Sequence, residues 1–330
     1  MTHPPAAADF DHVILTRFSV RFPGSPPVVD DDWLFYRWAF FCDALASSVA
    51  RQTVRTFQWL VFFDVETPAW LREEIDALSP GLFTPVYVSS WSSLIAQQAV
   101  AEVASAPYLI TTRIDSDDAI ARQFVADVQS HFDHQESLYI NLLCGIQVER
   151  TGEVYRYDEP SNPFISYVEK RVEHGLPRTV FYSLRHVMSR ANADVLNVVG
   201  APRWMQIIHG SNIANSVRGV RVRPERYEAD FDLELAFSRT VSGTRYLRER
   251  IRSILDLARL WIMYPHYVRE FRYARRLYLA GTTVLPREDI DPNYTPSAFW
   301  RIPGSRPLFN LIRKIETARR LRRNRLSRET

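Results

Sequence analysis

The chain has 330 residues, of which 46% are hydrophobic and 13% aromatic, so it can bury a sizeable core and is not a disordered protein. Its net charge is only +3, but residues 301–330 hold ten basic residues against two acidic ones, which leaves a mildly acidic body and a basic tail. Two distant cysteines, no signal-peptide pattern and no apolar run long enough to cross a membrane lead us to expect a cytoplasmic protein without disulfides.

Strand and helix patterns alternate through the first 133 residues. Four short apolar runs indicate buried strands, and each is followed by a segment with apolar residues at helical spacing. The predicted strands are 12–18, 57–64, 83–90 and 108–114, and the predicted helices are 33–53, 67–79, 93–105 and 123–133. This alternation predicts an α/β fold with a mostly parallel central sheet that helices cover on both faces.

After residue 137 the alternation ends. The stretches 137–149 and 152–158 predict a pair of strands joined by a tight turn, and residues 160–215 are irregular. Helical patterns return at the C-terminus, over 245–280 with a break at Pro265, and over 308–326. We therefore expect a main domain over residues 1–240 and a basic helical extension over residues 241–330.

The stretch "YLITTRIDSDDAI" is the most informative part of the sequence. Its strand ends in Arg113, and three carboxylates follow within four positions: Asp115, Asp117 and Asp118. Carboxylates at such spacing repel one another, and their burial is costly. A helix N-terminus explains one of them but not three. The spacing therefore indicates a site that binds positive charge.

A divalent ion that holds a diphosphate explains the cluster best. An EF-hand calcium loop would need Gly and Glu where this chain has Ile120 and Ala126. Mg²⁺ or Mn²⁺, in contrast, uses one or two carboxylates together with phosphate oxygens. Side chains 115 and 117 are two positions apart and point the same way if the chain stays extended.

Two enzyme classes place Asp-x-Asp at the end of a strand. One is the haloacid dehalogenase type of phosphatase, in which the first Asp is the nucleophile and a Lys and a Gly-Asp pair follow. In this chain no Gly precedes an Asp, and Lys170 is the one lysine in a suitable place. The stretch "RIDSDDAI" instead resembles the Asp-x-Asp-Asp of family 2-like GT-A glycosyltransferases.

Four blocks in order extend this resemblance over roughly residues 10–235. They are "FQWLVFFDVETP", "TTRIDSDDAI", "NPFISYVE" and "WMQIIHGSN", and together they are similar to a family of bacterial rhamnosyltransferases. The resemblance implies a Rossmann-like GT-A fold that binds a nucleotide-diphosphate sugar and transfers the sugar to a hydroxyl. Because no glycine-rich phosphate loop is present, we expect metal and arginine to hold the diphosphate.

The resemblance also implies roles for the carboxylate cluster. Asp117 is the first choice for a direct metal ligand. Asp115 is expected to contact the donor's ribose or a metal-bound water, and we include it among the metal ligands. Arg113 is expected to relieve the repulsion and to contact the nucleotide. Asp118 is either a supporting group of the donor site or a helix cap.

Further candidates lie where other predicted strands stop. Asp64, Thr16 and Arg17 end the first two strands and are expected to line the nucleotide pocket. In "WMQIIHGSN", His209 is expected to complete the metal shell, because imidazole is an acceptable ligand for Mn²⁺. Two neighbouring residues are also expected to contact the donor: Trp204 by stacking on a sugar, and Asn212 as a polar partner.

An inverting transfer needs a general base for the acceptor hydroxyl. Family 2 enzymes take it from an acidic pair about a hundred residues after Asp-x-Asp, and this chain lacks a clear pair there. Glu169 and Asp232 are our candidate catalytic residues, and Asp230 is a further rival.

The C-terminal third combines arginine with apolar residues. Residues 245–276 carry nine Arg against three acids. This pattern predicts either a solvated helix face or a peripheral contact with a membrane, and no nucleic-acid-binding motif is present.

The sequence thus predicts a metal-dependent, inverting glycosyltransferase with a glycan or lipid-linked acceptor. The alternatives are a non-catalytic nucleotide- or carbohydrate-binding protein on the same fold, and an Asp-nucleophile phosphatase.

Overall fold

The computed structural model describes residues 9–25, 30–149, 151–173, 175–182, 189–209, 217–231 and 242–288. Three sequence predictions lie outside the described residues, namely those for Asn212, for Asp232 and for a helix over 308–326.

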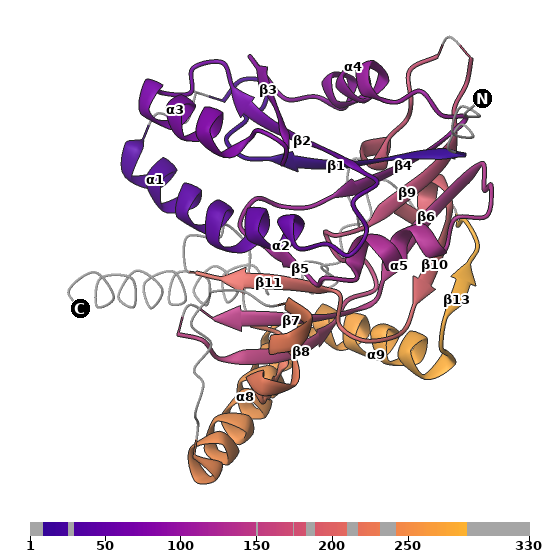
Figure 1. Ribbon diagram of the computed structural model, residues 1–330. Helices are drawn as coiled ribbons and strands as arrows, with labels where there is room; N and C mark the ends of the chain where they lie inside the picture. Colours follow the sequence, from indigo (N-terminus) through magenta and orange to yellow (C-terminus); the bar gives the residue numbers. More distant parts are fainter. Residues whose placement is uncertain are drawn as a thin grey trace, which may run out of the picture.

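The larger sheet has the strand order β13-β10-β6-β9-β4-β1-β2-β3 (Figure 1). Its pairings are parallel along β3-β2-β1-β4 and between β6 and β10, whereas β9 and β13 are antiparallel to their neighbours. The predicted mostly parallel sheet is therefore a mixed one. The bounds are β1 Phe10–Arg17, β2 Gln58–Asp64, β3 Thr84–Val88, β4 Tyr108–Arg113, β6 Ser137–Leu142, β9 Ser166–Lys170, β10 Asp194–Val198 and β13 Thr283–Leu285.

A smaller sheet follows the order β12-β8-β7-β11-β5. The stretch 137–149, predicted as one strand, is two strands that separate at Leu143 and enter different sheets. The predicted hairpin is confirmed between β7 and β8, where Gly152 adopts a φ of 89° in the turn. The bounds are β5 Ala119–Ile120, β7 Cys144–Glu149, β8 Val154–Asp158, β11 Trp204–Ile208 and β12 Val220–Val222.

Helices cover both faces of the larger sheet. On one face, α1 (Asp31–Phe40), a π-helical segment (Phe41–Ala46) and α2 (Ser47–Ala50) lie between the two sheets (Figure 1). The same core includes α3 (Ala69–Leu78) and α5 (Phe124–Ser130). On the other face, α4 (Ser93–Val103) buries its alanine-rich side against β1 and β2. The alternating apolar pattern thus produces a three-layer arrangement around the larger sheet.

The C-terminal region packs against the smaller sheet. The predicted break at Pro265 is confirmed, since α8 (Gly243–Met263) ends just before it and α9 (Pro265–Ala280) begins with it. The next strand, β13, joins the edge of the larger sheet by pairing with β10. The described part of the predicted extension is thus connected to both sheets, and the boundary at residue 240 stays a prediction. The remaining described helices are short: α6 (Ser189–Asn192), α7 (Glu228–Phe231), and two 3-10 helices at Val180–Tyr182 and Pro224–Arg226.

Candidate functional site

The strand order of the larger sheet reverses beside β1, and we call the edge formed there by the carboxyl ends of β1 and β4 the crevice. The chain runs outward from β1 through β2 to β3 and then returns to place β4 on the other side of β1. Ligands of open α/β sheets bind at such a reversal, at the carboxyl ends of the strands. Arg17, Asp64 and Arg113 end β1, β2 and β4 and therefore share this edge.

Asp115 is held by arginines at the mouth of the crevice. The Arg113 guanidinium donates to its carboxylate at 2.9–3.2 Å, and Arg17 Nη2 lies 3.9 Å from Asp115 Oδ1. The side chain of Asp115 remains 34% exposed, so a ligand in the crevice can reach it. The predicted relief of carboxylate repulsion by Arg113 matches this geometry.

Asp117 joins three segments that are distant in the sequence. Its Oδ2 atom accepts a hydrogen bond from Arg37 of α1 at 2.5 Å and lies 2.9 Å from Nε2 of His209, just after β11. A second Arg37 nitrogen donates to the hydroxyl of Ser116 at 2.7 Å. Sequence reasoning missed Arg37, although a lone cation within the aromatic stretch "WLFYRWAFF" is a signal that could have found it.

His209 is fixed by aromatic neighbours. Its ring stacks on Phe40 with a centroid distance of 4.5 Å, and Tyr36 meets it edge-on at 5.5 Å. The Tyr36 hydroxyl also donates to the backbone carbonyl of His209 at 3.1 Å. The side chain is fully buried, so the imidazole has one orientation in which Nε2 faces Asp117.

Asp118 ties the turn to the smaller sheet. Its Oδ1 atom accepts a hydrogen bond from the backbone N–H of Ile207 at 3.0 Å. Burial, and then the charges of Asp117 and Asp115, raise the pKa of Asp118 well above its usual range. The repulsion among three carboxylates in four positions thus adds to the cost of burying Asp118 in its charged form.

Arg17 lies among aromatic rings. Its guanidinium is 5.3–5.7 Å from the ring centroids of Phe22, Trp91 and Phe181. Burial, and then the neighbouring charge of Arg113, lower the pKa of Arg17 to about 10, so it stays charged at neutral pH. Two cations therefore face the crevice at the ends of β1 and β4.

The amino-acid sequence matches the model of one protein family. The model described as "Putative rhamnosyl transferase" matches residues 25–221, which include Arg37, the carboxylate cluster and His209. The chain belongs to this rhamnosyl transferase family. The resemblance found in the sequence is thereby confirmed. No curated protein sequence matches the chain.

Several solved structures are remotely similar to this rhamnosyl transferase family member. TarS 1-349 of S. aureus in complex with UDP-GlcNAc has a TM-score of 0.37 and 12% identity, over 66% of this chain and 64% of that one. A "putative nucleotide-diphospho-sugar transferase" from Desulfovibrio desulfuricans G20 has a TM-score of 0.32 and 15% identity, over 74% and 97%. HddC from Yersinia pseudotuberculosis has a TM-score of 0.27 and 10% identity, over 60% of this chain and 89% of that one. The chain spans less than two thirds of TarS 1-349, and the family assignment rests on the sequence match.

Asp64 is paired in this family member. Arg21 Nε lies 2.9 Å from Asp64 Oδ2, and the backbone N–H of Glu66 donates to Oδ1 at 2.8 Å. Arg21 also contacts the Glu66 carboxylate at 2.7 Å. The predicted base or ribose contact of Asp64 stays a prediction, and Arg21 is a further cation of this edge that the sequence analysis missed.

Two predicted donor contacts are buried in the core. The Thr16 hydroxyl accepts a hydrogen bond from the indole of Trp59 at 3.0 Å. Trp204 is fully buried, stacks on Phe164 at 5.2 Å and lies so close to Gly145 that a Cβ there would be 2.2 Å from the indole ring. Neither side chain reaches the surface. Their predicted contacts with nucleotide and sugar stay predictions.

The structure does not bring Glu169 to the carboxylate cluster. Glu169 pairs with Leu109 near the start of β4, six residues before Asp115, which corresponds to about 20 Å along a strand. Its two oxygens accept hydrogen bonds from the backbone N–H groups of Arg178 and Thr179, both at 2.8 Å. The carboxylate therefore organises a loop at the opposite end of β4.

Two of the three predicted metal ligands meet. Asp117 Oδ2 and His209 Nε2 lie 2.9 Å apart, which is a hydrogen-bonding distance, whereas Asp115 turns toward Arg113. Among the described residues, no group of three or more His, Cys, Asp and Glu side chains has the arrangement of a metal site. A metal here would need further ligands from the substrate.

Proposed function

We propose that this family member transfers a sugar, with rhamnose as first candidate, from a nucleotide-diphosphate donor to a hydroxyl of a glycan or lipid-linked acceptor. Membership of the rhamnosyl transferase family supports both the reaction class and the sugar. TarS, which is remotely similar, was solved with UDP-GlcNAc, a donor of the same chemical class. The reaction takes place on the cytoplasmic side, with a peripheral contact at the inner face of the membrane.

One observation carries the proposal, namely the cluster formed by Arg37, Asp117 and His209 beside the crevice of β1 and β4. A departing nucleoside diphosphate needs positive charge that is already in place. Arg17, Arg113 and Arg37 supply it from three directions around the carboxylates. Asp115 and Asp64 remain the candidates for contacts with the ribose and base.

Asp117 and His209 are the residues that would hold Mn²⁺ or Mg²⁺. When bound, such an ion neutralises the charge that develops on the leaving diphosphate. Arg37 and the aromatic pair Tyr36 and Phe40 hold these two side chains in position before any ligand binds. This rigidity reduces the cost of ordering the site on binding.

A single displacement with inversion needs a base close to the acceptor. We propose Asp232 rather than Glu169 for this role, because both oxygens of Glu169 are engaged far from the crevice. Helix α7, which ends one residue before Asp232, is bound to the segment after β5, where Arg122 N–H donates to the Asp230 carbonyl at 2.8 Å.

Thermal unfolding with a panel of nucleoside diphosphates and their sugars, each with and without Mn²⁺, tests the proposal. We expect one nucleotide to raise the unfolding temperature, because a ligand that binds the folded chain stabilises it by mass action. The effect should be larger with Mn²⁺ and should disappear in Asp117→Ala. Asp127→Asn, which alters a carboxylate paired with Arg203 outside the crevice, should behave as wild type. If no nucleotide stabilises the chain under either condition, the proposed donor site does not exist.

A further inference from the structure

Helix α8 exposes the apolar side of its surface. Its outer stripe consists of large apolar side chains that are 47–79% exposed: Leu247, Ile251, Ile254, Leu255 and Ile262. At 100° per residue these positions fall within about 100° of the helix circumference. Exposed apolar side chains scattered singly are ordinary, but a continuous stripe indicates a surface that binds something.

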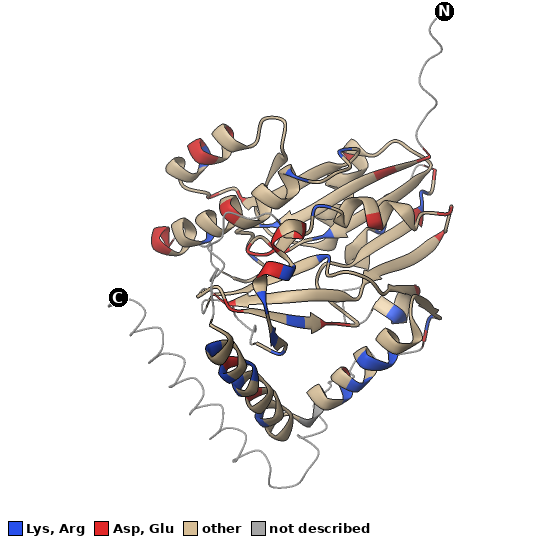
Figure 2. Ribbon diagram, turned by 60° about the horizontal axis from the view of Figure 1, so that its bottom comes forward, with Lys and Arg blue, Asp and Glu red and all other residues tan. Residues whose placement is uncertain are grey.

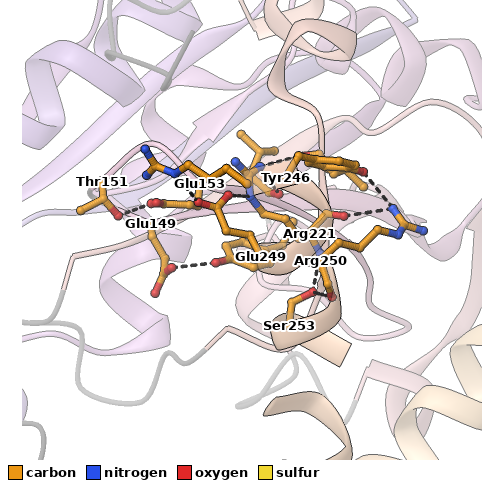
Figure 3. A network of polar contacts seen from close by, with 12 residues as sticks. Glu149, Thr151, Glu153, Arg221, Tyr246, Glu249, Arg250 and Ser253 are labelled. Carbon is orange, nitrogen blue, oxygen red and sulfur yellow. Dashed lines mark hydrogen bonds and ion pairs between the residues drawn. The ribbon is translucent and has the colours of Figure 1, made fainter. Parts of the chain in front are cut away.

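The inner side of α8 is polar at the sheet. Figure 3 shows Arg221 of β12 surrounded by residues of α8. The Arg221 side chain is fully buried, with Nε 3.3 Å from a Glu249 oxygen, and its backbone N–H donates to the Ser253 hydroxyl at 3.1 Å. Arg250 in turn donates to the Arg221 carbonyl and to the Tyr246 hydroxyl at 3.1 and 3.0 Å.

This network fixes the rotation of α8 about its own axis. A helix on a globular protein normally turns its apolar stripe toward the core and its charges toward water. To bury the outer stripe, α8 would have to rotate and leave the buried Arg221 guanidinium without Glu249, which is costly. The exposure of the stripe is therefore built into the structure.

The charges beside the outer stripe indicate what covers it. Arg248, Arg252 and Arg259 follow one edge of the stripe on the helix surface, and Figure 2 shows blue segments along both α8 and α9. Among the exposed residues of these two helices, basic residues outnumber the single acid, Asp256: they are Arg245, Arg248, Arg252, Arg259, Arg269, Arg272, Arg275 and Arg276. A second copy of the chain would bring two surfaces of the same sign together.

We propose that the outer stripe of α8 lies in the interface of an anionic lipid bilayer, with its arginines at the level of the phosphates. Apolar burial and attraction to anionic lipid together drive this kind of binding. None of the described helices combines the length and apolar composition that a membrane crossing needs. The helix would thus lie in the plane of the surface. This inference specifies the peripheral contact and does not rest on the transfer reaction.

Flotation of the full-length chain with lipid vesicles, without any nucleotide, tests the inference. We expect binding to phosphatidylcholine vesicles that contain phosphatidylglycerol, and much weaker binding to phosphatidylcholine alone. The double variant Ile251→Gln with Leu255→Gln should lose affinity by at least about tenfold, because it removes two apolar side chains while keeping good helix formers. Leu94→Gln on α4, where the leucine is 50% exposed, is the matched control and should bind as wild type.

A second variant and a second measurement separate this surface from the rest of the chain. Replacing Arg248, Arg252 and Arg259 by Gln should weaken binding to anionic vesicles by about 100-fold at low salt, and added salt should weaken wild-type binding. Unchanged binding in the Ile251 and Leu255 variant would overturn the inference, since another part of the chain would then bind the lipid. A wild-type dimer that this variant dissociates would also overturn it, by showing that a second copy covers the stripe.

Discussion

Two polar clusters connect elements of this molecule that are distant in the sequence, and they differ in how closely their carboxylates are spaced. At the crevice, Asp115, Asp117 and Asp118 stand within four residues, and Arg113 and Arg37 pair with the first two. At α8, the single buried guanidinium of Arg221 meets one carboxylate, Glu249, and backbone carbonyls. Burial, together with the two neighbouring carboxylates, raises the pKa of Asp118, whereas Glu249 has no carboxylate beside it in its network.

This difference separates a cluster that holds the fold from one that can take up a ligand. A carboxylate that is paired and has no carboxylate beside it gains little from an added ion. Carboxylates crowded into four residues repel one another and are stabilised by a cation, so the raised pKa of Asp118 is consistent with a binding role. The comparison predicts that changes at the crevice affect activity and that changes at α8 affect stability.

The largest expected effect is on activity. Asp117→Asn keeps the shape of the side chain but removes the charge that Arg37 and His209 share. We expect sugar transfer to fall by about 100-fold or more, as when one preorganised electrostatic contact is lost. Transfer assays and thermal unfolding of the same samples measure this. If Asp117→Asn unfolds easily but transfers sugar normally, the crevice cluster holds the fold and is not a binding site.

The α8 cluster should show the opposite behaviour. Arg221→Met leaves Glu249 and the Val154 carbonyl without their buried partner, and we expect a loss of about 3 kcal/mol in the free energy of unfolding. Arg245→Ala removes an exposed arginine from the same Glu249 and should cost much less, because water screens an exposed ion pair. Urea unfolding compares the two. Equal losses would show that burial does not distinguish these arginines.

A smaller effect is expected within the same cluster. Ser253→Ala removes the hydroxyl that accepts the Arg221 N–H and donates to the Arg250 carbonyl. The expected loss is about 1 kcal/mol, the usual net value of a buried hydrogen bond. Urea unfolding is again the measurement, and a loss as large as that of Arg221→Met would mean that the hydroxyl, not the ion pair, holds α8.

The last prediction is pH-dependent and concerns Glu270, which lines a cavity of about 210 Å³ between α8, α9 and β8. Burial, and then the charge of Glu159, raise the pKa of Glu270 to about 7. The folded state therefore binds a proton more tightly than the unfolded state, and stability falls as the pH rises from about 4.5 toward 7. Glu270→Gln should remove this fall, so that it is more stable than wild type at pH 8 but not at pH 4. The same difference in the free energy of unfolding between wild type and Glu270→Gln at both pH values would contradict the raised pKa.

The first half of the fold could be predicted well from the sequence. Strands β1, β2 and β4 are mostly buried, so each contains an apolar run, and the helices between them have the expected spacing. The stretch 137–149 was harder, because β6 and β7 are both apolar and no turn residue marks their separation at Leu143. Strand direction could not be predicted from the sequence either, so the antiparallel strands β9 and β13, which make the sheet a mixed one, were not expected.

The candidate site could be predicted in part. Strand ends and the family resemblance indicated Asp117 and His209, which lie 2.9 Å apart. Glu169 was chosen from its motif alone, and only the antiparallel register of β9 shows that it lies at the other end of β4. Arg37 was missed because a charged residue in a helix usually faces water, and only the packing of α1 between the sheets turns it toward Asp117.

The origin of the crevice cluster has a consequence for synthesis of the protein. Arg37 comes from α1, Asp117 from the turn after β4, and His209 from the end of β11, which also pairs with β5. A nascent chain on the ribosome can form the first four strands early, but it cannot complete this cluster until more than 200 residues have emerged. Until then Asp117 and Asp118 lack the histidine and the Ile207 amide, so these contacts cannot yet hold the turn that carries the two carboxylates.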